Sequence, residues 1–173
     1  MGTVTLITGG ARSGKSAHAL TLAQRTPGAR RFFIATAEAL DDEMRERIAH
    51  HRAGRSADFA TIEEPIAIRA ALLELASRAD IVVVDCLTLW ISNLMMTRRG
   101  DEEILAEARG LAGAMADAPF ASIVVTDEVG AGIVPENALA RRFRDLLGWT
   151  NQALAQTSER VVLMVAGYPL RVK

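Results

Sequence analysis

The stretch Gly9-Gly10-Ala11-Arg12-Ser13-Gly14-Lys15-Ser16 lies near the start of the chain and decides how the remainder is interpreted. Before it, the β-branched and apolar run Val4-Thr5-Leu6-Ile7-Thr8 predicts a buried strand. After it, residues 17–23 predict a helix. A strand, a glycine-framed turn and Lys-Ser at the start of a helix together form the context of a phosphate-binding P-loop.

The residue types in this loop suit the binding of a polyphosphate. The glycines allow backbone N–H groups to converge on phosphate oxygens, and the helix N-terminus adds positive dipole character. Lys15 is expected to contact the outer phosphates and to be catalytic, and the Ser16 hydroxyl to hold Mg²⁺. A chance glycine turn is the alternative, but four matching motif positions and two correct flanks disfavour it. Residues 9–16 therefore predict a nucleoside triphosphate site.

Composition is that of an ordinary globular protein. The 173 residues suit one domain, 1–173, and half of them are apolar. A net charge of −1 gives no electrostatic argument for a nucleic-acid or anionic-membrane partner. The single cysteine, Cys86, excludes an internal disulfide and suits a reducing compartment. No apolar run is long enough for a membrane span and no signal-peptide pattern is present, so a cytoplasmic location is expected.

Strand and helix patterns alternate along the chain. Strands are predicted at 4–8, 31–36, 59–62, 81–85, 122–126 and 160–165. Helices are predicted at 17–23, 41–52, from Pro65 to about 77, 87–96, from an N-cap at Asp101 to about 116, and 137–157, the last with core candidates Leu139, Phe143, Leu146 and Leu154. This alternation predicts an α/β fold of the P-loop NTPase type, a three-layer α/β/α sandwich around a mostly parallel, twisted sheet. In such a fold the ligand lies at the carboxyl ends of the strands.

Acidic residues end two of the predicted strands. Asp85 closes the apolar run Ile81–Val84 and is the favoured candidate to organise Mg²⁺ around the phosphates. A second strand ends in the same way at Asp127-Glu128, so composition alone leaves open which acid serves the metal. The loop 127–136 is long for a connection, which suggests a functional role.

Two of the three histidines, His50 and His51, are adjacent in a charged helical segment. The ordinary interpretation of such a pair is solvated surface. A neutral imidazole is nevertheless a competent nucleophile toward phosphorus, and the pair lies just before the loop-like sequence Arg52-Ala53-Gly54. Spacing alone does not decide between these two interpretations. Cys86 is expected to be a core residue, and His18 to be structural or surface-exposed.

Several segments together resemble one family: 9–16, Ile34-Ala35-Thr36, 41–44 with 47–52, and 128–137. The likeness continues through Asp85-Cys86-Leu87-Thr88 and Asn93-Leu94 to Ala166-Gly167 and Pro169. The family is the bifunctional adenosylcobinamide kinase / adenosylcobinamide-phosphate guanylyltransferase of cobalamin biosynthesis. Many ATPases and GTPases share the P-loop, whereas the aspartate–histidine segment and the segment 128–137 are far more specific.

The resemblance implies two activities. Members phosphorylate adenosylcobinamide with ATP or GTP, then transfer GMP from GTP to adenosylcobinamide phosphate through a guanylylated histidine. It also implies a homotrimer, for which the apolar stretch 87–96 with Trp90 is an interface candidate, although a core helix explains that stretch equally well. Carried onto this chain, the guanylylated residue is His50. The implied nucleotide contacts are 9–16, Ile34, Ala35, Thr36, His51, Arg52, Ala53, Gly54, Glu63 and Asp85, with Glu64 as the alternative to Glu63.

Other functions are compatible with the residues. One alternative is a P-loop kinase of another small alcohol. Another is a nucleotide-switched binding module in which the loop 127–136 reports nucleotide state. The sequence does not distinguish ATP from GTP for the kinase step, and it does not indicate the corrinoid-binding residues or the roles of Asp127 and Glu128.

Overall fold

The computed structural model describes residues 2–38, 42, 45–46 and 57–173. Seven strands form one sheet in the order β3-β2-β4-β5-β1-β6-β7. All neighbouring strands are parallel except the terminal pair β6 and β7, which is antiparallel. The strands are β1 Val4–Gly9, β2 Arg31–Ala35, β3 Phe59–Glu63, β4 Ile81–Asp85, β5 Ala121–Val125, β6 Arg160–Val165 and β7 Tyr168–Arg171.

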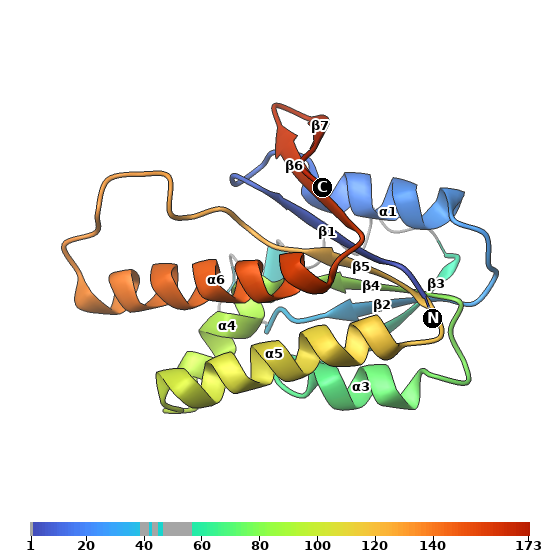
Figure 1. The fold of residues 1–173 in the computed structure, drawn as a ribbon, viewed down its shortest axis with the longest axis horizontal. Coiled ribbons are helices and arrows are strands. Elements are labelled where there is room, and N and C mark those ends of the chain that lie inside the picture. The colour runs from blue at the N-terminus through green and yellow to red at the C-terminus, as the bar shows by residue number, and fades with distance from the viewer. Residues whose placement is uncertain (1, 39–41, 43–44, 47–56) are drawn as a thin grey trace.

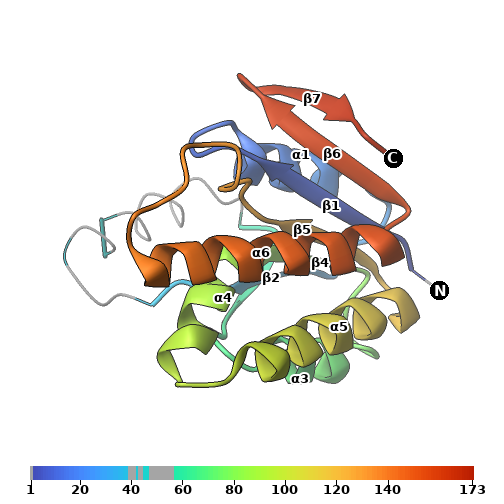
Figure 2. The same ribbon diagram turned by 60° about the vertical axis from the view of Figure 1, so that its left-hand side comes forward.

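Helices cover both faces of this sheet (Figure 1). Within the described part of the chain, one face carries α1, and the opposite face carries α3, α4, α5 and α6 (Figures 1 and 2). The helices are α1 Lys15–Arg25, α3 Ile68–Glu74, α4 Leu87–Met96, α5 Asp101–Asp117 and α6 Ala138–Thr157. The predicted α/β/α class with a mostly parallel sheet is therefore confirmed.

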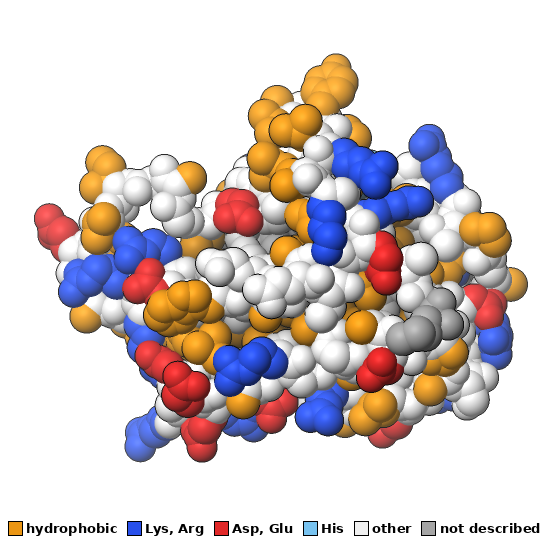
Figure 3. Space-filling view, in the orientation of Figure 1, with side chains coloured by type: hydrophobic (Ala, Val, Ile, Leu, Met, Phe, Trp, Pro, Cys, Tyr) orange, Lys and Arg blue, Asp and Glu red, His pale blue; other side chains and the backbone are white. Residues whose placement is uncertain are grey.

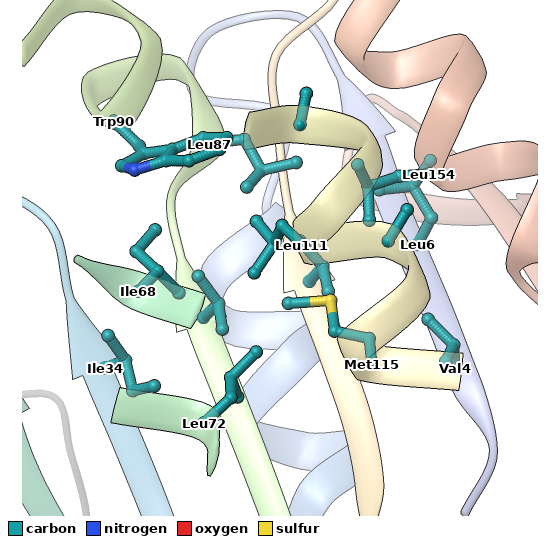
Figure 4. Packing of buried hydrophobic residues seen from close by; sticks show 14 of the residues in the cluster. Val4, Leu6, Ile34, Ile68, Leu72, Leu87, Trp90, Leu111, Met115 and Leu154 are labelled. Atoms are coloured by element: carbon teal, nitrogen blue, oxygen red, sulfur yellow. The ribbon is translucent and has the colours of Figure 1, made fainter. Parts of the chain in front are cut away.

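The larger of two apolar clusters fills the space between the sheet and the four helices α3 to α6. Figure 4 shows strand residues such as Leu6 and Ile34 facing Leu72, Leu111 and Leu154 of the covering helices. These side chains are almost completely buried, and each removes apolar surface from water at about 25 cal/mol per Å². The core thus holds the carboxyl ends of β1, β4 and β5 in fixed relative positions.

The apolar side of helix α4 belongs to this core. Leu87, Ile91 and Leu94 are fully buried, and Trp90 is 1% exposed. The Trp90 indole N–H donates to the Ile66 carbonyl oxygen at 2.8 Å, so its one polar atom is also satisfied inside the chain. Trp90 itself therefore packs in the core, whereas Met96 at the end of α4 is 75% exposed, and an interface that involves the 87–96 stretch stays a prediction.

Four details differ from the sequence-based expectations. α3 begins at Ile68 and ends at Glu74, because the Glu64 carboxylate accepts from the N–H groups of Ile66 and Ala67 and holds the chain before the helix. The N-cap of α5 is Gly100, and Asp101 is the first helical residue. Leu139 is 59% exposed because the start of α6 projects beyond the sheet (Figure 1). Strand β7, absent from the expectations, pairs with β6.

The hairpin β6–β7 leaves one edge of the sheet apolar. Val165, Tyr168, Leu170 and Val172 are all largely exposed. Figure 3 shows hydrophobic side chains gathered over the free end of this hairpin.

Among the described residues, no helix is both long and apolar enough to cross a bilayer.

Candidate nucleotide-binding site

The loop between β1 and α1 has the backbone geometry of a phosphate cradle. Gly9 ends β1 with φ +148°, and Gly14 precedes α1 with φ +92°, both values that favour glycine. A Cβ atom on Gly9 would lie 2.6 Å from the Met164 carbonyl oxygen of neighbouring β6. The turn is closed by the Ser13 N–H, which donates to the Gly10 carbonyl oxygen at 3.3 Å. These contacts set the loop over the N-terminus of α1, where backbone N–H groups lack helical partners.

Lys15, the first residue of α1, folds its side chain back over this loop. Its ammonium group donates to the Gly10 carbonyl oxygen at 2.6 Å and forms an ion pair with Asp127 Oδ1 at 2.6 Å. Lys15 is only 8% exposed, so its charge lies in a partly desolvated setting where electrostatic interactions are stronger than in water. The group expected to contact phosphates is therefore present at the loop and is paired with a carboxylate.

Asp127 and Glu128 follow Thr126, the first residue after β5, and β5 lies between β1 and β4. The Asp127 N–H donates to Thr88 Oγ1 of α4 at 2.9 Å. The Glu128 N–H donates to the Gly9 carbonyl oxygen at 3.1 Å, and the Glu128 carboxylate accepts from Thr8 Oγ1 at 2.7 Å. The start of the 127–136 loop is thus attached to the strand that leads into the P-loop.

Asn151, in the middle of α6, completes this attachment. Its amide oxygen accepts from Thr126 Oγ1 at 2.7 Å. Its amide nitrogen donates to the Asp127 carbonyl oxygen at 3.1 Å and lies 3.4 Å from Glu128 Oε1. One buried amide therefore orients three consecutive residues at the end of β5.

Asp85 ends β4, two strands away from β1, on the same edge of the sheet. The Thr36 hydroxyl lies between this turn and β2: it donates to the Cys86 carbonyl oxygen and accepts from the Cys86 N–H, both at 2.8 Å. Asn93 of α4 donates to the Thr36 carbonyl oxygen at 2.8 Å. This network fixes the backbone on both sides of Asp85 at the site edge.

The other predicted nucleotide contacts are distributed unevenly around this edge. Ile34 and Thr36 have buried side chains in and just after β2, and Ala35 pairs with Asp85. Glu63 ends β3 opposite Ala35 and is exposed, whereas the Glu64 carboxylate accepts from the N–H groups of Ile66 and Ala67 just before α3. The choice between Glu63 and Glu64 as a nucleotide contact stays a prediction. His50, His51, Arg52, Ala53 and Gly54 lie outside the described residues.

A magnesium ion suits the oxygen atoms available at this edge. Ser16 in the first turn of α1 and Asp85 after β4 supply a hydroxyl and a carboxylate, which are ligand types that Mg²⁺ prefers. Across the ranges that the structure describes, no group of three or more His, Cys, Asp or Glu side chains gathers to hold a metal. One hydroxyl and one carboxylate are only two ligands, so this donor set fits an ion that shares its coordination with substrate phosphates, as Mg²⁺ commonly does.

Two further residues near the site behave as structural groups. Burial raises the pKa of the Cys86 thiol to about 12, with the Asp85 charge as a smaller cause, so the thiolate needed for nucleophilic attack is not populated. Partial burial lowers the pKa of His18, with a smaller contribution from Arg25. The expectation that Cys86 packs and does not react is consistent with its environment.

The C-terminal hairpin also contacts the P-loop. The Gly167 N–H in the β6–β7 turn donates to the Ser13 carbonyl oxygen at 3.1 Å. Gly167, Asn151, Thr8 and Thr88 were not identified as site residues from the sequence. The only signals for them were their small or polar character beside apolar positions and, for Thr88 and Gly167, their place in segments that carry the family resemblance.

The fold and this loop place the chain in the P-loop NTPase fold class. Solved structures with the same fold include the RadB recombinase, with a TM-score of 0.52 and 16% identity over 93% of this chain and 73% of that one. A prototypical ATPase from the type III secretion system of pathogenic bacteria gives a TM-score of 0.56 and 12% identity over 95% of this chain and 51% of that one. At these identities the likeness concerns the fold alone.

Sequence comparison identifies the family. The family described as cobinamide kinase / cobinamide phosphate guanyltransferase matches residues 5–172. The bifunctional adenosylcobalamin biosynthesis protein CobP of Pseudomonas aeruginosa is 44% identical over 97% of this chain and 96% of its own length. The bifunctional protein CobU of Escherichia coli is 38% identical over 97% of this chain and 98% of its own. The chain belongs to this family and is an enzyme of it, which confirms the resemblance seen in the sequence.

Proposed function

We propose that the protein phosphorylates adenosylcobinamide with ATP or GTP and then transfers GMP from GTP to the resulting adenosylcobinamide phosphate. The second transfer uses His50 as nucleophile and gives adenosylcobinamide-GDP and pyrophosphate. The observation that supports this most is the Lys15 ammonium at the P-loop of a chain that matches this family from residue 5 to residue 172. The relatives with 38–44% identity are named as bifunctional adenosylcobalamin biosynthesis proteins.

The two steps attack different phosphorus atoms. In the kinase step the substrate hydroxyl oxygen forms a bond to the γ-phosphorus, the bond to the β-phosphate oxygen breaks, and the nucleoside diphosphate leaves. In the guanylyl step an imidazole nitrogen bonds to the α-phosphorus and pyrophosphate leaves. The substrate phosphate then displaces the histidine. Lys15 serves both steps, since a cation at the outer phosphates orients a γ-phosphoryl group and also stabilises departing pyrophosphate.

Magnesium ion is the proposed cofactor, with Ser16 and Asp85 as the residues that would hold it. When bound, it supplies positive charge that offsets the phosphate oxygens. A homotrimer is proposed from the family resemblance alone, and a cytoplasmic location stays the expectation drawn from the sequence.

The histidine assignment is tested with GTP labelled at the α-phosphate. The wild-type protein is expected to form an acid-labile, base-stable adduct, His50→Ala to form none, and the matched variant His51→Ala to retain it. His50→Ala is expected to keep kinase activity, whereas Lys15→Ala loses both activities. An undiminished adduct in His50→Ala excludes His50 as the nucleophile. Turnover of adenosylcobinamide separates the proposal from a kinase of another alcohol and from a binding module.

A further inference from the structure

The backbone of Asp127 is held in place by contacts on both sides. Its N–H donates to Thr88 of α4 at 2.9 Å, and its carbonyl oxygen accepts from Asn151 of α6 at 3.1 Å. The following residue, Glu128, is hydrogen-bonded to Gly9 at 3.1 Å. Each contact ends on a helix or strand that the core fixes. The backbone of Asp127 therefore keeps its carboxylate within reach of Lys15 at the P-loop.

The Asp127 carboxylate is already paired with the Lys15 ammonium group, the cation that is expected to contact the phosphates. The Lys15 ammonium lies 2.6 Å from Asp127 Oδ1, and the two side chains are only 9% and 23% exposed. When a triphosphate approaches Lys15, its phosphate oxygens compete with the Asp127 carboxylate for the ammonium group. The Asp127 carboxylate stays near the phosphates. Like charges a few ångströms apart and shielded from water repel strongly. Repulsion by Asp127 therefore weakens the binding of a triphosphate that carries no counter-ion.

We propose that Asp127 is a specificity-determining residue that makes the P-loop select triphosphate carrying a divalent cation and reject the metal-free form. The cation offsets the charge that Asp127 adds to the site, so the carboxylate is tolerated only in the metal-bound complex. The proposal rests on the proposed function in one respect, namely that residues 9–16 bind a triphosphate. It requires neither the corrinoid substrate nor the histidine step.

Calorimetric titration of the full-length protein tests this selection. GTP and inorganic tripolyphosphate are each titrated with excess MgCl₂ and, separately, with EDTA. The variant Asp127→Asn removes the charge but keeps the backbone groups that bind Thr88 and Asn151. Asp127→Glu restores the charge, and Asp117→Asn, at the end of α5, makes the same charge change near the opposite edge of the sheet.

Asp127→Asn is expected to bind metal-free GTP and tripolyphosphate about tenfold or more tighter than wild type, as the loss of one nearby like charge implies. The gain should be much smaller with MgCl₂, and Asp127→Glu should resemble wild type. Equal or weaker metal-free binding by Asp127→Asn overturns the proposal, as does an equal gain in both conditions or a similar gain in Asp117→Asn. Failure of the wild type to bind magnesium-GTP would instead remove the proposed function, and this inference with it.

Discussion

At the scale of single residues, Asn151 is the group on which the geometry of the site most depends. It is 8% exposed and accepts from Thr126 while donating to Asp127 and approaching Glu128. Replacing it with Leu keeps the volume but leaves the Thr126 hydroxyl and the Asp127 carbonyl without this partner. Buried groups that lose a hydrogen bond cost about 1–3 kcal/mol.

Asn151→Leu is therefore expected to lower the free energy of unfolding by about 1–3 kcal/mol. It should also raise the KM for nucleotide, because the start of the 127–136 loop loses its attachment. Urea denaturation followed by circular dichroism measures the first effect and steady-state kinetics the second. Gln152→Leu is the matched control, since Gln152 is the next residue of α6 and is exposed. Equal behaviour of the two variants would contradict a positioning role for Asn151.

Local sequence predicted the residues of the P-loop but not the partner of Lys15. Residues 9–16 are contiguous, and their function depends on spacing within one turn, so a sequence pattern suffices. The ion pair between Lys15 and Asp127 joins residues more than a hundred positions apart and depends on β5 lying next to β1. Strand order is a property of the whole sheet. For that reason the sequence could not choose between the acids after β4 and β5.

At the scale of elements, the end of β1 and the end of β6 are packed too closely to admit a side chain. Gly9 pairs with Met164 across the two strands, and a Cβ on Gly9 would also lie 2.9 Å from Ser13 Oγ. At Gly10, the next residue, a Cβ would meet no other part of the described chain within 4 Å. The two glycines therefore have different reasons for being in the loop.

Gly9→Ala is expected to lower the free energy of unfolding by about 1–3 kcal/mol, because an overpacked contact and an unfavourable φ must both be accommodated. Gly10→Ala should change it by less than about 0.5 kcal/mol, as is usual at open positions. Thermal melts of the two variants make the comparison. If Gly10→Ala folds stably but binds nucleotide more weakly, the added methyl group blocks a phosphate that approaches the backbone at this position. Similar melting temperatures for both variants would show that the close contact at Gly9 relaxes at little cost.

Elements with a clear burial pattern were predicted well, and elements without one were not. β1, β4 and β5 are buried on both faces, as parallel strands inside a sandwich are. β7 is exposed along its whole length and contains Pro169, so neither alternation nor an apolar run marks it. Proline is tolerated there because β7 is an edge strand. Edge position, which comes from the assembled sheet, explains why this strand was missed.

At the scale of the whole molecule, the carboxyl ends and the amino ends of the parallel strands have different roles. The carboxyl edge holds the P-loop and its acids, whereas at the amino edge an ion pair links the turn before β2 to the residue before β4. There, Asp80 accepts from the backbone N–H groups of Ala29 and Arg30 at 3.0 and 2.9 Å and forms an ion pair with the Arg30 guanidinium at 2.6 Å. Side-chain hydrogen bonding to Arg30 is the main reason that the pKa of Asp80 lies well below its usual range.

A carboxylate with a depressed pKa in the folded state stabilises the fold above the pKa of the unfolded chain. That contribution is complete at neutral pH and is lost as the pH falls below about 4, the ordinary range of an aspartate. Asp80→Asn should therefore be less stable than wild type at pH 7, and the difference should shrink progressively below pH 4. Denaturation midpoints measured from pH 7 to pH 2, with Asp117→Asn as charge control, test this dependence.

Binding of magnesium-GTP by Asp80→Asn should stay unchanged at pH 7, because the turn and the P-loop lie at opposite edges. A loss of nucleotide affinity in a folded Asp80→Asn would show that the two edges are coupled through β4.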